Sequence, residues 1–93
     1  MRSVRHTQRF KRDYRREKSG RYRRSLDTDL ADAVNLLAND EALPRRYFDH
    51  ALSGEWRDFR DCHIKPDLIL IYRKPDAESL EMVRLGSHSE LGF

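Results

Sequence analysis

The spacing of apolar residues changes at Gly54 from a helical to an extended pattern, and this change limits the chain to folds that combine helices with strands. In residues 25–39 apolar side chains recur every three or four positions, which predicts a helix with one apolar face. Residues 7–18 predict a shorter, basic helix with Thr7 as its N-cap. Helices first and strands afterwards are typical of an α+β fold.

Three strands are expected after the second helix, over residues 56–64, 68–74 and 80–85. Residues 45–54, which precede them, are expected to form a loop. Pro and Asp in both segments between the strands favour tight turns, so neighbouring strands should be antiparallel. Residues 2–6 could add an edge strand ahead of the helices. The expected order is β-α-α-β-β-β, with two helices packed on one face of an antiparallel sheet.

A chain of 93 residues supplies one hydrophobic core, so residues 1–93 are expected to form a single domain. The longest apolar run, residues 68–72, is far shorter than the roughly 20 residues that cross a bilayer. The first ten residues lack the apolar stretch of a secretory signal. Cys62 is the only cysteine, so no internal disulfide can form and a structural role is expected for it. These features predict a cytoplasmic protein without a membrane partner.

Basic residues are concentrated at the N-terminus, although the whole chain carries a net charge of only +3. Residues 1–24 hold 11 basic and 2 acidic side chains, whereas the other 69 residues hold 8 basic and 14 acidic ones. Such a segment attracts phosphate backbones or an acidic protein partner. A solvated, arginine-rich helix face is the plainer interpretation. Charge alone does not distinguish RNA, DNA and protein as the partner.

Side chains that can transfer protons or bind phosphate gather in the second half of the chain. The candidates are His50, His63, Asp67, His88, Arg60 and Arg84. His63 and Asp67 flank one expected turn and should lie close together, whereas the sequence does not fix where the other two histidines lie. RNA carries its own nucleophile, so a base, an acid and a cation suffice to cut it without a metal. The residue types therefore suit phosphoryl chemistry better than acyl transfer.

Structural roles explain the same residues one by one. Asp67 follows Pro66 as an ordinary turn residue would, and a histidine at a strand end is often a surface residue. Each candidate arginine could instead pair with an acid, for which the options are Asp58, Asp61 and Glu81. The core, rather than base stacking, is the expected place of Trp56, Phe59 and Tyr72. A metal site is disfavoured because the histidines lack the close spacing of known ligand motifs.

The order of residues from 47 to 72 carries a longer pattern, D-H-x-L-x-G-x-W-x-x-[FY]-R-D-x-H-x-x-P-D-x-I-L-I-Y. Residues 84–88 add the ending R-x-G-[ST]-H. This combination resembles the YafQ branch of the RelE-type toxins, and the resemblance covers residues 47–93. Residues 1–46 are similar only in their helical layout.

The resemblance implies a RelE-like fold and a small bacterial toxin of a toxin–antitoxin pair, which enters the ribosomal A site and cuts mRNA without a metal or other cofactor. It implies His88 as the general acid, His50 or Asp67 as the base, and His63 as a residue that orients or stabilises the phosphate. Arg60 and Arg84 then contact phosphate. An antitoxin would wrap the toxin and block this cleft, and operator DNA would be contacted only through their complex. The basic N-terminal segment would dock on ribosomal RNA.

Two positions depart from a well-known relative in this branch. Leu68 stands where that relative has a tryptophan thought to hold the mRNA base, and Phe93 lies one place later than its counterpart. Codon preference or rate could therefore differ, although Phe93 could still contact the RNA. Two rival functions stay open. One is a ParE-like toxin that binds a protein target such as gyrase without cleaving RNA, and the other is a noncatalytic nucleic-acid-binding domain.

Overall fold

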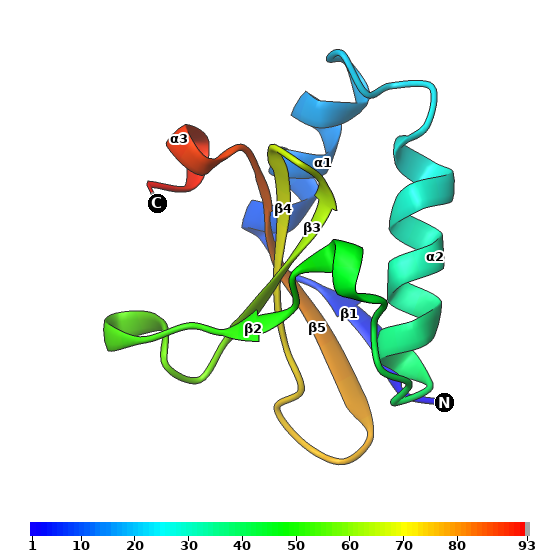
Figure 1. Ribbon diagram of the computed structural model, residues 1–93, viewed down its shortest axis with the longest axis vertical. Helices are drawn as coiled ribbons and strands as arrows, with labels where there is room; N and C mark the ends of the chain where they lie inside the picture. Colours follow the sequence, from blue (N-terminus) through cyan, green and yellow to red (C-terminus); the bar gives the residue numbers. More distant parts are fainter. Residues whose placement is uncertain (93) are drawn as a thin grey trace.

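The computed structural model describes residues 1–92, and Phe93 lies outside the described residues. Its strands are β1 (Ser3–His6), β2 (His50–Ala51), β3 (Arg60–Lys65), β4 (Leu68–Arg73) and β5 (Ser79–Gly86). Its α-helices are α1 (Gln8–Lys18), α2 (Leu26–Ala38) and α3 (His88–Leu91), and short 3₁₀ helices cover Arg45–Tyr47 and Gly54–Trp56. Figure 1 shows α2 and α3 on opposite sides of the sheet. The predicted α+β class is confirmed.

The five strands form one sheet in the order β1-β5-β4-β3-β2. The strands β3, β4 and β5 form the expected antiparallel meander, and β2 pairs with β3 antiparallel as well. Strand β1 instead runs parallel to β5, with Ser3 opposite Ser79 and His6 opposite Met82. The sheet is therefore mixed rather than purely antiparallel. A parallel partner is available because the helices and the meander return the chain to the same edge.

The main core lies between the sheet and the two long helices. Helix α2 contributes Leu26, Leu30 and Leu37, and α1 contributes Phe10. The sheet presents to them the alternate residues of its strands, among which are Cys62, Ile64, Leu68, Leu70, Tyr72, Leu80 and Met82. Cys62 is fully buried and burial raises the pKa of its thiol, as expected of a structural cysteine. On the other face Ile69 and Ile71 pack with Leu91 of α3 and with partly buried Trp56 and Phe59.

Helix α1 also completes the sheet edge where β1 stops. Pairing with β1 ends at Met82, so the backbone of residues 83–85 has no strand neighbour on that side. The Thr7 hydroxyl donates to the Val83 carbonyl at 2.8 Å, and Asp13 accepts from the Leu85 N–H at 3.0 Å. Thr7 also accepts from the Phe10 N–H, which confirms it as the N-cap of α1.

The segment between α2 and β3 is more structured than the sequence indicates. Residues 45–54 were expected as a loop, but they contain a 3₁₀ turn and strand β2, because two residues of β2 pair with Arg60 and Asp61. The expected strand over residues 56–64 begins only at Arg60, since Trp56 lies in the second 3₁₀ turn. Within residues 1–92 no helix has the length and apolar character that crossing a membrane requires.

Candidate functional site

His88 and Asp67 form a hydrogen-bonded pair at one end of the sheet. Asp67 lies in the turn between β3 and β4, and its Oδ1 is 2.7 Å from Nδ1 of His88 and 3.1 Å from the backbone nitrogen of the same residue. These hydrogen bonds from His88 lower the pKa of Asp67. An ionised carboxylate only accepts, so Nδ1 of His88 carries a proton and Nε2 is left for a substrate.

Helix α3 fixes the position of His88, its first residue. Ser87 caps the helix in a capping box with Glu90, in which each side chain bonds the backbone nitrogen of the other residue. Glu90 also pairs with Arg16 of α1 at 2.9 Å. Gly86 permits this approach, because a side chain there would come within 2.8 Å of Arg16 Nη2. A helix of four residues is thus held by contacts at both ends.

His50 pairs with a buried carboxylate that the sequence did not single out as catalytic. Its Nδ1 lies 3.1 Å from Asp61 Oδ1 and 2.7 Å from the carbonyl oxygen of Phe48. A carbonyl can only accept, so Nδ1 is the protonated nitrogen and Nε2 of a neutral His50 can accept a proton. Burial raises the pKa of Asp61, and the nearby histidines partly offset this.

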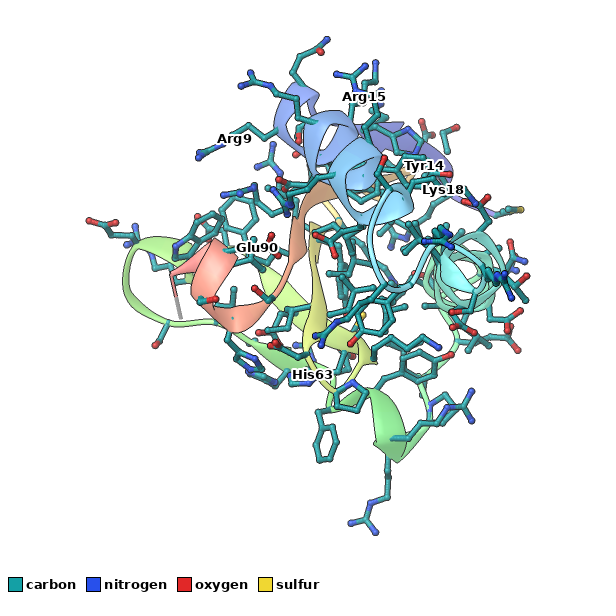
Figure 2. The ribbon with its side chains drawn as sticks, turned by 90° about the horizontal axis from the view of Figure 1, so that it is seen from above. Arg9, Tyr14, Arg15, Lys18, His63 and Glu90 are labelled. Atoms are coloured by element: carbon teal, nitrogen blue, oxygen red, sulfur yellow. The ribbon has the colours of Figure 1, made fainter. Side chains whose placement is uncertain are left out.

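Both histidine pairs lie on the sheet face opposite α1 and α2. Along β3, Cys62 and Ile64 point into the helix-covered core, so Asp61 and His63 point to the other face. His63 stands between the pairs, with its ring centroid 5.4 Å from that of His88. In the view of Figure 2, His63 lies on the side of the molecule away from Arg9 and Arg15 of α1. The structure therefore brings together the four proton-transfer candidates, His50, His63, Asp67 and His88, and adds Asp61.

The two candidate arginines are held by other carboxylates, although the register Asp61–Ile71–Arg84 places Arg84 on the same sheet face as Asp61. Arg60 pairs across the sheet with Tyr72, which faces the main core, and its guanidinium lies 3.3 Å from Asp49. Arg84 is held by Asp13 at 2.7 Å, and its side chain is only 13% exposed. Each arginine therefore pairs with an acid, as the structural interpretation allowed, but the acids are Asp49 and Asp13 rather than the examples Asp58, Asp61 and Glu81. Both arginines have carboxylate partners, and their contact with phosphate stays a prediction.

Two further residues near the histidines were missed by the sequence reasoning. Arg21, in the connection between α1 and α2, places Nη2 3.6 Å from the outer oxygen of Asp67. Phe48 is 66% exposed beside His63. Neither could be found from spacing, because both lie in irregular segments. Asp61 could have been found, since it stands two residues before His63 on a strand and must share its face.

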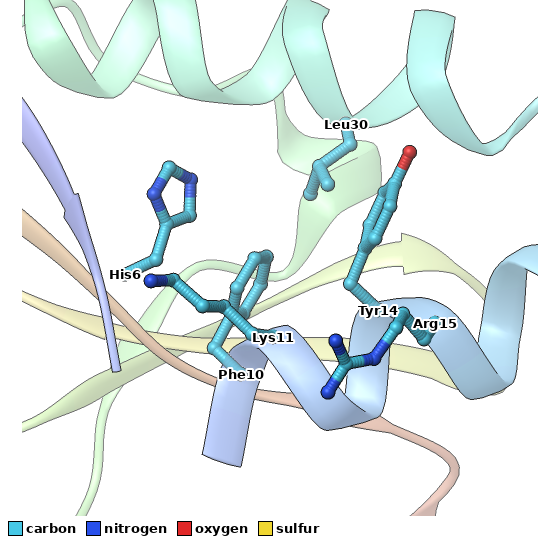
Figure 3. A pocket seen from close by; sticks show the side chains of 6 residues that line it. All are labelled: His6, Phe10, Lys11, Tyr14, Arg15 and Leu30. Atoms are coloured by element: carbon cyan, nitrogen blue, oxygen red, sulfur yellow. The ribbon is translucent and has the colours of Figure 1, made fainter. Parts of the chain in front are cut away.

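Leu68 and the hollow between α1 and α2 lie apart from the histidine cluster. Leu68 is fully buried in the main core and presents no surface to a ligand. Within residues 1–92, no group of three or more His, Cys, Asp or Glu side chains is arranged to hold a metal ion. A separate hollow of about 360 Å³ lies between α1 and α2, lined by Phe10, Tyr14 and Leu30 with basic residues at its rim (Figure 3). It contains none of the candidate residues.

Comparisons with known proteins identify relatives of the whole described chain. A family model described as "Bacterial toxin of type II toxin-antitoxin system, YafQ" matches residues 2–92. The mRNA interferase toxin YafQ of Escherichia coli K12 is 45% identical over 56 residues, which are 60% of each chain. The match thus spans less than two thirds of that relative's length.

Solved structures extend the similarity over nearly the full length. A copper-bound mutant toxin from Helicobacter pylori is 36% identical, with a TM-score of 0.86 over 98% of this chain and 99% of its own. The toxin in a crystal structure of the E. coli DinJ–YafQ complex is 30% identical, with a TM-score of 0.79 over 98% of both chains. The family model and these structures agree, and the chain belongs to the YafQ family of type II toxin–antitoxin toxins, which has a RelE-like fold.

Proposed function

We propose that residues 1–93 act as a single toxin domain that cuts mRNA in the ribosomal A site, without a metal, and so inhibits translation in the cytoplasm. One observation carries this proposal. Two histidines on the same sheet face each present Nε2 outward because a carboxylate or carbonyl holds Nδ1. A pair of this kind suits concerted removal and delivery of protons. The name of the E. coli relative, an mRNA interferase, supports the same activity.

His50 is the better candidate for the general base. Its neutral Nε2 can take the proton of the RNA 2′-hydroxyl, and the 2′-oxygen then attacks the adjacent phosphorus. Asp67 is the weaker candidate, because its two hydrogen bonds from His88 lower its pKa and occupy its Oδ1. Asp61 would stabilise the imidazolium that forms on His50, at 3.1 Å from Nδ1.

His88 is the candidate general acid. Asp67 accepts from Nδ1 of His88, and the protonated imidazole can deliver its Nε2 proton to the 5′-oxygen as the P–O5′ bond breaks. The products are a 2′,3′-cyclic phosphate and a 5′-hydroxyl, and no oxidant, metal or other co-reactant is needed. His63, between the two pairs, and Arg21, beside Asp67, are the groups near enough to stabilise charge on the phosphate.

An antitoxin protein is the proposed physiological partner, and operator DNA would be bound only through the toxin–antitoxin complex. The E. coli YafQ toxin forms a complex with DinJ, which supports such a partner here. The basic face of α1 is the proposed contact to ribosomal RNA. Arg9 and Arg12 are exposed on this face and make no ion pair within residues 1–92, so their charges are available to phosphate.

The test is mapping of mRNA 5′-ends from translating ribosomes after brief expression of the wild type and of His88→Gln. We expect cuts in phase with codons for the wild type and at least a roughly 100-fold weaker signal for the variant. Ser89→Ala, on the same short helix, is the matched control and should cut like the wild type. Undiminished cutting by His88→Gln would remove His88 from the mechanism. Growth arrest without any cuts would instead favour a noncleaving, ParE-like toxin.

A further inference from the structure

Phe48 combines two unfavourable features at one residue. Its side chain is 66% exposed, whereas the other phenylalanines of residues 1–92 are buried or partly buried. Its backbone is left-handed, with φ 48° and ψ 41°, a conformation that a bulky side chain rarely adopts. Exposure gives no burial energy to offset this strain. Strain of this kind is retained where the position of the residue serves a function.

The left-handed turn directs the two parts of Phe48 toward two candidate catalytic residues. Its carbonyl oxygen accepts from Nδ1 of His50 at 2.7 Å. Its ring centroid lies 5.6 Å from the centroid of the His63 ring, at an angle of 59° between the planes. The phenylalanine therefore lies against the histidine cluster and presents its remaining aromatic surface to solvent.

A hollow of about 470 Å³ opens beside the Phe48 ring. Its lining is mostly apolar and includes His63, Ile64 and Pro66, with Arg46 and Lys65 at its rim. Lys65 is neutralised by Asp29 at 2.6 Å. Arg46 lies over the Tyr47 ring and makes no ion pair within residues 1–92, so its charge remains available. An aromatic surface with a free cation beside it is the arrangement that binds single-stranded nucleic acid.

We propose that Phe48 is a stacking platform for a nucleobase of the bound RNA, on the side of the scissile phosphate that His63 faces. The inference rests on the proposed function, because it assigns the RNA that the histidines cut. Leu68 cannot serve in this way, since it is fully buried in the main core. A protein ligand is less favoured, because Phe48 contacts the residues that would act on the phosphate itself.

The test uses ribosomes programmed with a message that carries the fluorescent base 2-aminopurine in the A-site codon. A 2′-O-methyl group at the cut position prevents cleavage, so binding is measured alone. Phe48→Asn removes the ring and suits the left-handed backbone, while Phe48→Trp keeps an aromatic surface. We expect the wild type and Phe48→Trp to quench the fluorescence. Phe48→Asn should lose the quenching and bind about 5- to 140-fold more weakly, with a melting temperature no lower than that of the wild type.

Several outcomes would overturn the inference. The first is that the wild type does not quench the fluorescence. The second is that Phe48→Asn quenches and binds as well as the wild type does. The third is that Phe48→Asn loses affinity only for the antitoxin, which would assign the surface to a protein partner. If Phe48→Asn fails to fold, Phe48→Gly replaces it with the same expectation. Cleavage of an unmodified message by the wild type is scored separately. Quenching without cleavage would refute the proposed nuclease and leave the base-binding surface standing.

Discussion

Replacing Asp61 by asparagine should separate the stability of this protein from its proposed activity. Asp61 is 5% exposed, and its Oδ1 makes no hydrogen bond of good geometry within residues 1–92, with His50 Nδ1 nearby at 3.1 Å. A buried, incompletely paired carboxylate costs stability, so Asp61→Asn should raise the free energy of unfolding by about 1 to 3 kcal/mol. In a domain of this size that corresponds to at least about 4 °C in melting temperature.

The stability gained by Asp61→Asn should increase as the pH rises. Burial raises the pKa of Asp61 above the ordinary value of 3.8, so the folded state holds this proton more tightly than the unfolded state. The carboxylate therefore costs nothing at low pH, and its cost appears as pH rises from about 4 through the raised pKa. The difference in melting temperature between Asp61→Asn and the wild type should widen over this interval and then become constant.

The rate of RNA cleavage should be lower in Asp61→Asn than in the wild type. In serine proteases the corresponding change costs about 10⁴-fold, because the histidine adopts the wrong tautomer. Here the Phe48 carbonyl still accepts from His50 Nδ1 at 2.7 Å, so the tautomer survives and only the stabilisation of the imidazolium is lost. We expect a loss of about 10- to 100-fold, as for other carboxylate partners of functional histidines.

The assays are thermal unfolding between about pH 4 and 7.5 and single-turnover cleavage of mRNA on programmed ribosomes. Asp58→Asn is the matched control, because Asp58 is an exposed acid three positions before Asp61 and should leave both measurements unchanged. The reasoning is refuted if Asp61→Asn is less stable than the wild type at neutral pH, or if it cleaves at the full rate. The first result would mean that Asp61 is stabilised by interactions other than its contact with His50, and the second that His50 does not depend on this carboxylate.

Two further predictions concern α1. Asp13→Ala should lower the free energy of unfolding by about 3 kcal/mol or more and the melting temperature by over roughly 10 °C, because it leaves Arg84 and the Leu85 N–H without their acceptor. The double variant Arg9→Gln/Arg12→Gln should reduce the slope of log affinity against log salt for ribosomes by about 1.4 to 1.8. The control is the double variant Lys11→Gln/Arg15→Gln, which removes the same charge from residues that line the hollow between α1 and α2 (Figure 3). It should leave the slope unaltered. If both double variants reduce the slope equally, the proposal that Arg9 and Arg12 form the RNA-binding face is refuted.

Local patterns predicted the parts of the fold that local interactions determine. The apolar stripe of α2, the cap of α1 and the turn at Pro66 and Asp67 each depend on residues a few positions apart, and all three are confirmed. The parallel pairing of β1 was not predictable in this way. It joins Ser3 to Ser79, and nothing in either segment alone specifies the other as its partner.

The candidate site was predictable only in its composition. The alternation of β3 fixes that Asp61 and His63 share a face, but the pair between His50 and Asp61 needs β2, a strand too short for any periodicity. The carboxylate partners of the arginines were not predictable for the same reason. Arg84 pairs with Asp13, 71 residues away, so its partner depends on how α1 crosses the sheet edge.

The two carboxylates of the site lie in opposite environments, and this difference supports the proposed roles. Asp61 is buried, so its pKa is raised and its charge is partly stabilised by His50, whereas Asp67 accepts two hydrogen bonds and its pKa is lowered. An ionised Asp67 accepts the Nδ1 proton of His88 at 2.7 Å, so Nε2 is the nitrogen of His88 that can reach the leaving oxygen. Nδ1 of His50 lies 2.7 Å from the Phe48 carbonyl oxygen and 3.1 Å from Asp61, so Nε2 is the nitrogen that can take a proton while Asp61 lies near enough to stabilise the charge that forms.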